Sequence, residues 1–139
     1  PPAMKTPLKS LLLALALSPV ALTPLAAGPK QEAVIKALAQ EAGVSGFSAE
    51  RGRAFFQADH KGGKPETPSC TTCHTSDPRA EGKTRAGKPI APMAVSRSPD
   101  RFTDPEKLAK WFRRNCNSVL GRECSVTEKG EILSYLNSL

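Results

Sequence analysis

Residues 30–42 are the first segment in which charged residues are frequent, and apolar residues recur there at helical spacing. Within residues 30–42, Val34, Ile35 and Leu38 fall on one face of a helix. Gly43 follows directly, and glycine is the residue that most often ends a helix. The pattern therefore predicts an amphipathic helix over 30–42.

A second helix is predicted over residues 49–58. Ser48 precedes it and can accept a hydrogen bond from the free backbone amides of the first turn. Phe55 and Phe56 give this helix an aromatic contribution to a core. The following residues, 61–69, contain two glycines and two prolines and are predicted to be a loop.

Two further helices are predicted near the C-terminus by their start and stop signals. Asp104 followed by Pro105 is a strong helix start, and Gly121 is expected to end that helix. Ser125 with Glu128 forms a capping box at the start of the last helix. In the first of these helices, Leu108, Trp111, Phe112 and Asn115 fall on nearby turns. In the second, the residues expected to enter a core are Ile132, Leu133, Tyr135 and Leu136.

Residues 75–103 contain four prolines and no sustained hydrophobic period, so they are predicted to be a long loop. A loop of this length in a compact domain has to wrap over another part of the molecule. No strand is needed to account for the pattern. The expected fold class is all-α.

The N-terminal region has the pattern of a secretory leader. Met4 is the expected start, so Pro1–Ala3 lie upstream of it; Lys5 and Lys9 supply positive charge before an apolar stretch at 10–22. Small residues follow, and cleavage is expected after Ala27. Residues 1–27 are thus assigned to upstream residues and leader, and 28–139 to one mature domain.

Prolines within the leader argue against a stable membrane anchor, because Pro7, Pro19 and Pro24 interrupt a spanning helix. Loss of Lys5 and Lys9 lowers the formal charge from +7 to +5. The chain has one Trp, one Tyr and five Phe, which is little apolar bulk for a small core. Export places the domain in the periplasm and excludes nucleic acid as a partner.

The sequence Cys70-Thr71-Thr72-Cys73-His74 has the C-x-x-C-H form of covalent haem attachment. Two thiols bond to the haem vinyl groups, and the next histidine coordinates the iron. The spacing brings both sulfurs to one edge of the porphyrin and the imidazole under the metal. Cys70, Cys73 and His74 are therefore the predicted haem-binding residues, and a buried porphyrin would supply the missing apolar bulk.

Two other uses of these cysteines are weaker. A thioredoxin-like redox pair needs alternating strands and helices, which this pattern lacks. A zinc site would have to recruit Cys116 and Cys124, whose separation fits the usual close pairs of zinc ligands poorly.

The chain from Arg51 to Leu136 resembles the SHP-type oxygen-binding cytochromes c and their relative cytochrome c″, a branch of the class I cytochromes. The segments that carry the resemblance are Glu50–Arg53, Gly62–Pro65, Thr67–His74, Ile90–Pro92, Pro99–Asp104, Arg114–Val119 and Gly121–Cys124. Only the part before Arg51 matches poorly. The resemblance implies helices packed around one covalent haem c.

The resemblance also implies the second axial ligand, which is the residue before the first cysteine of a small disulfide loop. That residue is Asn115 here, and Cys116 and Cys124 would form the disulfide. An amide oxygen suits ferric iron better than ferrous iron, so the bond is expected to break on reduction. The ferrous site would then bind O2, CO or NO.

Met93 is the competing ligand, because a His74/Met93 pair would make an ordinary electron-transfer cytochrome. The family has an aliphatic residue at this point, so packing is the plainer interpretation of Met93. His60 lies in a polar, glycine-rich stretch and is expected to be a surface loop residue. Trp111, Phe112 and Tyr135 are expected to pack in the core or the haem pocket.

Basic residues in the loops around the haem motif suggest a positive rim that an acidic electron donor could approach. These residues are Lys61, Lys64, Arg79, Lys83, Arg85, Lys88, Arg97 and Arg101. The resemblance implies di-haem cytochromes c and membrane cytochromes b as donors. The sequence thus predicts an electron acceptor that binds diatomic gases; enzymatic turnover of O2 or nitrogen oxides stays open, since no general acid or base is evident beside Asn115.

Overall fold

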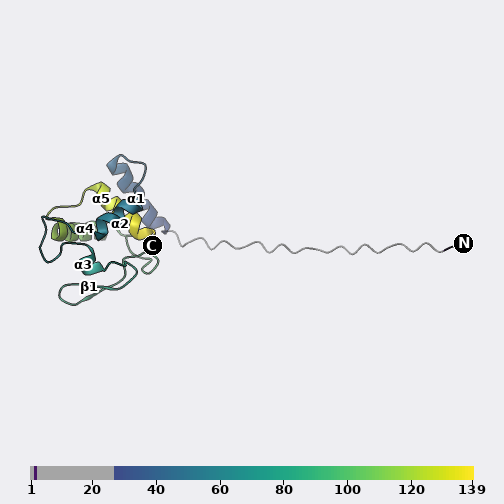
Figure 1. Ribbon diagram of the computed structural model, residues 1–139. Coiled ribbons are helices and arrows are strands. Elements are labelled where there is room, and N and C mark those ends of the chain that lie inside the picture. The colour runs from purple at the N-terminus through teal and green to yellow at the C-terminus, as the bar shows by residue number, and fades with distance from the viewer. Residues whose placement is uncertain (1, 3–26) are drawn as a thin grey trace.

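The structure is a computed structural model that describes residue 2 and residues 27–139, so the predicted leader lies almost wholly outside it. Its elements in chain order are α1 (Pro29–Ala42), α2 (Ala49–Gln57), α3 (Thr71–His74), β1 (Gly82–Lys83), β2 (Pro89–Ile90), α4 (Pro105–Leu120) and α5 (Val126–Asn137) (Figure 1). The fold is all-α, as predicted. No helix in the described part of the chain combines the length and the apolar character needed to cross a membrane.

Local signals set the helix ends where the sequence predicts them. Gly43 ends α1 and Gly121 ends α4, each in the left-handed conformation that favours glycine. Ser48 caps α2 by accepting a hydrogen bond from the Arg51 amide. Asp104 caps α4 through the amides of the first turn, and Ser125 forms the predicted capping box at the start of α5.

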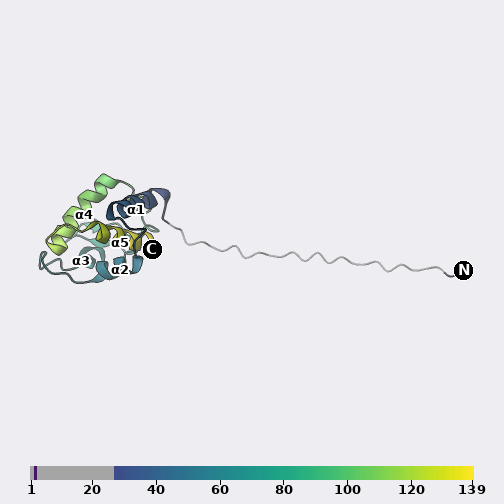
Figure 2. The same cartoon turned by 90° about the horizontal axis from the view of Figure 1, so that it is seen from above.

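Helix α5 lies against both α1 and α2 and forms the centre of the domain (Figures 1 and 2). The contact between α2 and α5 is close because Gly52 has no side chain: a Cβ atom there would lie 1.8 Å from the Glu131 carbonyl oxygen. The guanidinium of Arg51 pairs with the Glu131 carboxylate beside this crossing. Phe56, Ile132, Tyr135 and Leu136 fill the core next to it, with 1–6% of each exposed.

The prediction that no strand is needed was wrong in one detail. β1 and β2 form a two-residue antiparallel ladder in which Gly82 pairs with Ile90 and Lys83 with Pro89. Strands this short show no alternation of polar and apolar residues, so the pattern gives no signal for them. The ladder lies within the long loop and does not change the fold class.

The long loop between α3 and α4 wraps over the ends of α1 and α5, as its length requires. The buried side chain of Gln31 in α1 donates hydrogen bonds to the carbonyls of Pro99 and Arg101, at 2.6 and 2.9 Å. The amide of Val95 donates to the Leu136 carbonyl at the end of α5. These contacts hold the loop against one side of the cavity described next.

Candidate functional site

Helix α3 is a single turn that carries the cysteines and histidine of the C-x-x-C-H motif. The amides of His74 and Thr75 donate to the carbonyls of Cys70 and Thr71, at 3.1 and 3.0 Å. Ser69 is buried just before this turn; its hydroxyl accepts a hydrogen bond from the Thr71 amide and donates one to the Phe56 carbonyl in α2. The turn is therefore anchored directly to the helical core.

The other side of α3 is covered by the β1–β2 ladder. A Cβ atom on Gly82 would lie 2.2 Å from the Cys73 carbonyl oxygen, so only glycine allows β1 to approach so closely. Thr75, which follows His74, has a positive φ of 62° and turns the chain away from the helix. Its hydroxyl donates to the Asp77 carbonyl at 2.7 Å. Backbone on both sides thus fixes the position of His74.

A largely apolar cavity lies between α3 and the other helices. It brings together the residues that the sequence singled out: Cys70, Cys73, His74, Met93, Asn115, Cys116 and Cys124. The rest of its lining is mainly apolar side chains from α2, α4, α5 and the long loop, among them Phe55, Phe56, Phe102, Leu108, Trp111, Phe112, Ile132, Leu133 and Leu136. Four helices, α2, α3, α4 and α5, and the loops around α3 thus contribute to the cavity.

The thiol and imidazole in this cavity are held in their neutral forms. Burial raises the pKa of the Cys70 thiol to about 11, so this cysteine stays protonated at neutral pH. Burial and, second to it, the positive charge of Arg101 lower the pKa of His74 to about 4. Neutral imidazole is the form that coordinates a metal. The Nδ1 atom of His74 is buried and has no hydrogen-bond partner.

These features disfavour the two other uses of the cysteines. A reactive redox pair needs a cysteine with a lowered pKa, whereas the pKa of Cys70 is raised. A zinc site cannot use Cys116 and Cys124, because they are joined in a disulfide. Within residues 27–139, no group of three or more His, Cys, Asp or Glu side chains is arranged to hold a metal ion.

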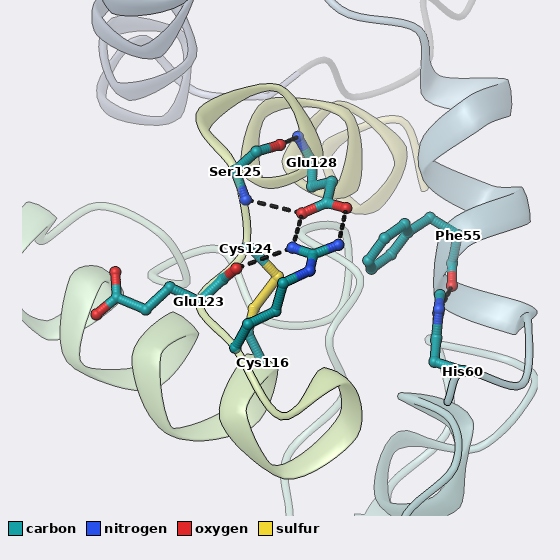
Figure 3. A network of polar contacts seen from close by, with 8 residues as sticks. Phe55, His60, Cys116, Glu123, Cys124, Ser125 and Glu128 are labelled. Atoms are coloured by element: carbon teal, nitrogen blue, oxygen red, sulfur yellow. Dashed lines mark hydrogen bonds and ion pairs between the residues drawn. A yellow bond between two sulfur atoms is a disulfide. The ribbon is translucent and has the colours of Figure 1, made fainter. Parts of the chain in front are cut away.

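Helix α4 contributes residues from Leu108 to Leu120 to the lining of the cavity. Cys116 of α4 is bonded to Cys124, and the disulfide lies beside the start of α5 (Figure 3). Phe55 packs against this pair from α2. The guanidinium of Arg122 donates two 2.8 Å hydrogen bonds to Glu128, which lower the pKa of that carboxyl. Asn115 precedes the disulfide, as the resemblance requires.

A loop before the motif also packs against the C-terminal end of α4, a contact that the sequence did not predict. A Cβ atom on Gly63 would lie 2.4 Å from the Ser118 carbonyl oxygen. The Lys64 amide donates to the same carbonyl at 2.8 Å, and the buried Thr67 hydroxyl lies 2.9 Å from the Ser118 hydroxyl. Residues 51 positions apart in the chain give no local pattern that could reveal such contacts.

His60 differs from its expected place on the surface. The residue is half-buried, and its ring packs against Phe55 with 4.5 Å between the ring centroids and a tilt of 41°. Its Nε2 lies 2.9 Å from the Phe55 carbonyl oxygen. His60 does not line the cavity, so it remains outside the candidate site.

Met93 and Asn115 both line the cavity, so its lining does not choose between them as ligands. Met93 is half-buried on the long loop, and its amide donates to the Pro78 carbonyl at 2.8 Å. It packs against the core cluster around Phe56. Such packing is a sufficient structural role for a methionine.

Comparisons with known proteins agree with this arrangement. Residues 42–136 match a family described as a domain of unknown function, DUF1924. The cytochrome c-type protein SHP of Cereibacter sphaeroides is 50% identical over 122 residues, which are 88% of this chain and 95% of that protein. Cytochrome c″ of Methylophilus methylotrophus is 37% identical over 86 residues, which are 61% of this chain and 60% of that protein.

Solved structures show the same likeness. Oxidized SHP, described as an oxygen-binding cytochrome c, has a TM-score of 0.73 and 51% identity, covering 76% of this chain and 94% of its own. Oxidized cytochrome c″ of Methylophilus methylotrophus has a TM-score of 0.64 and 30% identity, covering 77% and 92%. The helices around the cavity therefore have the arrangement of these cytochromes.

Proposed function

Because this chain belongs to the SHP family of c-type cytochromes, we propose that it is a periplasmic electron acceptor whose reduced form binds a diatomic gas. Membership of the family implies one covalently bound haem c. The observation that carries the proposal is the set of residues that line one largely apolar cavity: two free cysteines and a half-buried, neutral histidine at α3, together with an asparagine of α4.

The residues of the cavity fit a covalently attached haem. Cys70 and Cys73 are free, lie on one short helical turn and are available for thioether bonds. His74 follows them on the same turn, with its imidazole neutral and Nδ1 left without a partner by the protein. Most of the lining side chains are apolar, which suits the apolar faces of a porphyrin. When bound, haem supplies the one-electron chemistry and an axial position for a gas.

Asn115 is the proposed redox-labile ligand. Its amide is neutral and binds through oxygen, so it should hold ferric iron and release ferrous iron. The freed amide can then donate a hydrogen bond to a gas in the vacated position. The SHP relative is described as oxygen-binding, which supports O2, CO and NO as the class of ligand. Di-haem cytochromes c and membrane cytochromes b are the proposed electron donors.

A plain electron carrier with permanent His74 and Met93 ligation is the second candidate. It is favoured by one observation, the presence of the Met93 side chain in the same cavity. The two functions differ in whether the ferrous protein has an open axial position.

We expect Asn115→Ala to change the ferric optical spectrum and to leave the ferrous spectrum nearly unaltered, because the amide binds only the oxidised iron. The matched control is Met93→Leu, which should change neither spectrum. Spectra of the purified holoprotein are recorded oxidised, reduced, and reduced under CO.

The opposite pattern would overturn the proposal. If the reduced protein is six-coordinate, ignores CO, and opens only in Met93→Leu, then the His74/Met93 carrier is the correct function. Fast CO binding by the unmodified reduced protein supports the open ferrous site.

The low pKa of His74 predicts ligation that resists acid. An unfolded histidine has a pKa of about 6.5, so protonation favours the unfolded chain. The stability from neutral His74 is complete above pH 6.5 and is lost as the pH falls below this value. We expect an unchanged optical spectrum from pH 7 to 5, with a falling free energy of unfolding. A spectral change between pH 7 and 6 would contradict this.

A further inference from the structure

The outer surface of α4 carries four basic side chains that the loop-based interpretation of the sequence did not use. Lys107, Lys110, Arg113 and Arg114 are all exposed. None of them forms one of the ion pairs found within residues 27–139. Glu106, in the first turn, is the one acidic residue of this helix. The surface of α4 is therefore strongly positive.

Three of these residues line up with a tryptophan. Lys107, Lys110, Trp111 and Arg114 occupy positions i, i+3, i+4 and i+7, so they share one side of α4. We call this set the α4 stripe. The guanidinium of Arg114 lies 5.1 Å from the centroid of the Trp111 ring, which is a cation–π contact.

Trp111 joins the stripe to the haem cavity. Its side chain is among those that line the cavity, and the same ring carries Arg114 on the surface. Asn115, one turn further along the helix, also lines the cavity. A partner that contacts the stripe would therefore lie next to the side of the cavity that holds the proposed labile ligand.

The predicted positive rim around the motif is weaker than the sequence suggests. Arg85 pairs with Glu66 at 2.8 Å, and Arg79 lies 4.0 Å from Asp77. Arg101 turns its guanidinium to the Pro92 carbonyl, at 2.6 Å. Ion pairs thus engage two of the eight loop residues and a third is half-buried, whereas all four basic residues of α4 are exposed and outside the ion pairs of residues 27–139.

We propose that the α4 stripe is the docking surface for an acidic protein electron donor, whose carboxylates meet Lys107, Lys110 and Arg114. The inference rests on the proposed role of the protein as an electron acceptor. One electron passes from the donor, which is oxidised, to the ferric iron, which becomes ferrous; no bond or proton is exchanged at the surface. Opposite charges would speed the encounter and orient it toward the cavity.

The test compares two charge-reversal variants of the holoprotein. Lys107→Glu with Lys110→Glu alters the stripe, and Lys83→Glu with Lys88→Glu makes the same change of charge in the exposed loop around β1 and β2. A glutamate at position 107 lies in the first turns of a helix, where negative charge is tolerated. Stopped-flow reduction by an acidic flavodoxin hydroquinone is measured at low and high ionic strength, together with the reduction potential of each variant.

At low ionic strength we expect the stripe variant to react about tenfold more slowly than the unmodified protein, with its salt dependence lost. The loop variant should react within about threefold of the unmodified protein, because the Coulomb energy of a charge falls with its distance from the docking site. Equal losses in both variants, or a larger loss in the loop variant, would overturn the proposal. Spectra and CO binding are recorded on the same samples and report on the Asn115 ligand separately. A failure of the docking proposal can therefore be distinguished from a failure of the proposed function.

Discussion

Replacing Cys70 and Cys73 together with serine is expected to abolish covalent haem attachment. Thioether bonds need thiols, and these are the two free cysteines within residues 27–139. Acid–acetone extraction should then remove haem from the variant, while it leaves haem on the unmodified protein. The mass spectrum of the variant should show the polypeptide mass alone.

The other cysteine pair provides the matched control. Cys116→Ser with Cys124→Ser removes the same number of sulfur atoms but acts on the disulfide. This variant should keep its haem through acid–acetone treatment, although its stability should fall by roughly 2–3 kcal/mol, the chain-entropy value for a loop this short. Retention of covalent haem by the Cys70 and Cys73 variant would contradict the assigned attachment.

Replacing Gly52 with alanine is expected to destabilise the whole domain by about 3 kcal/mol. The added methyl group would lie within 1.8 Å of the Glu131 carbonyl oxygen, and backbone at this distance cannot rotate away as a flexible side chain could. Helices α2 and α5 would have to separate, although Phe56 and Leu136 pack between them. Urea unfolding of the holoprotein, followed by helical circular dichroism, measures the loss.

Gly46→Ala is the control for this substitution. No heavy atom lies within 4 Å of a Cβ atom at Gly46, and its backbone is not in the left-handed region. Its effect should stay within about 0.5 kcal/mol. If both glycine variants unfold at the same urea concentration, the close crossing of α2 and α5 does not limit stability.

Features encoded by adjacent residues could be predicted well from the sequence. Ser48, Asp104, Gly121 and Ser125 act through hydrogen bonds or backbone angles within their own turn, so the predicted helix ends agree with the structure. The C-x-x-C-H motif is equally local, because five consecutive residues contain its whole chemistry. The apolar positions of α5 were also recovered, since helical spacing alone identifies its buried face.

Asn115 could not have been found from local pattern, because asparagine near the end of a helix is common. Only the resemblance singled it out; in the structure Asn115 is an exposed residue that also lines the cavity. Its assignment as an iron ligand stays a prediction, as does that of His74. The disulfide, also implied by the resemblance, is present.

Long-range contacts account for what the sequence did not reveal. Gln31 reads as an ordinary polar helix residue, yet it is buried and holds the long loop by two hydrogen bonds. The fit of Gly52 against Glu131 depends on how two helices cross, which no window of residues encodes. Trp111 was expected to pack in the core or the haem pocket; it does line the cavity, but 46% of it stays exposed and carries Arg114 on its ring.

The contacts of loop residues 62–67 with α4 limit how the proposed ligand can move. Ser118 lies one turn beyond Asn115 and is held through its carbonyl and its hydroxyl, and Gly121 at the end of the helix lies against Gly62. This part of α4 is consequently a poor hinge. The Asn115 amide would leave and return by rotation about its own side-chain torsions. Opening and closing of the site would then need little rearrangement of the backbone and would not limit the rate of reduction.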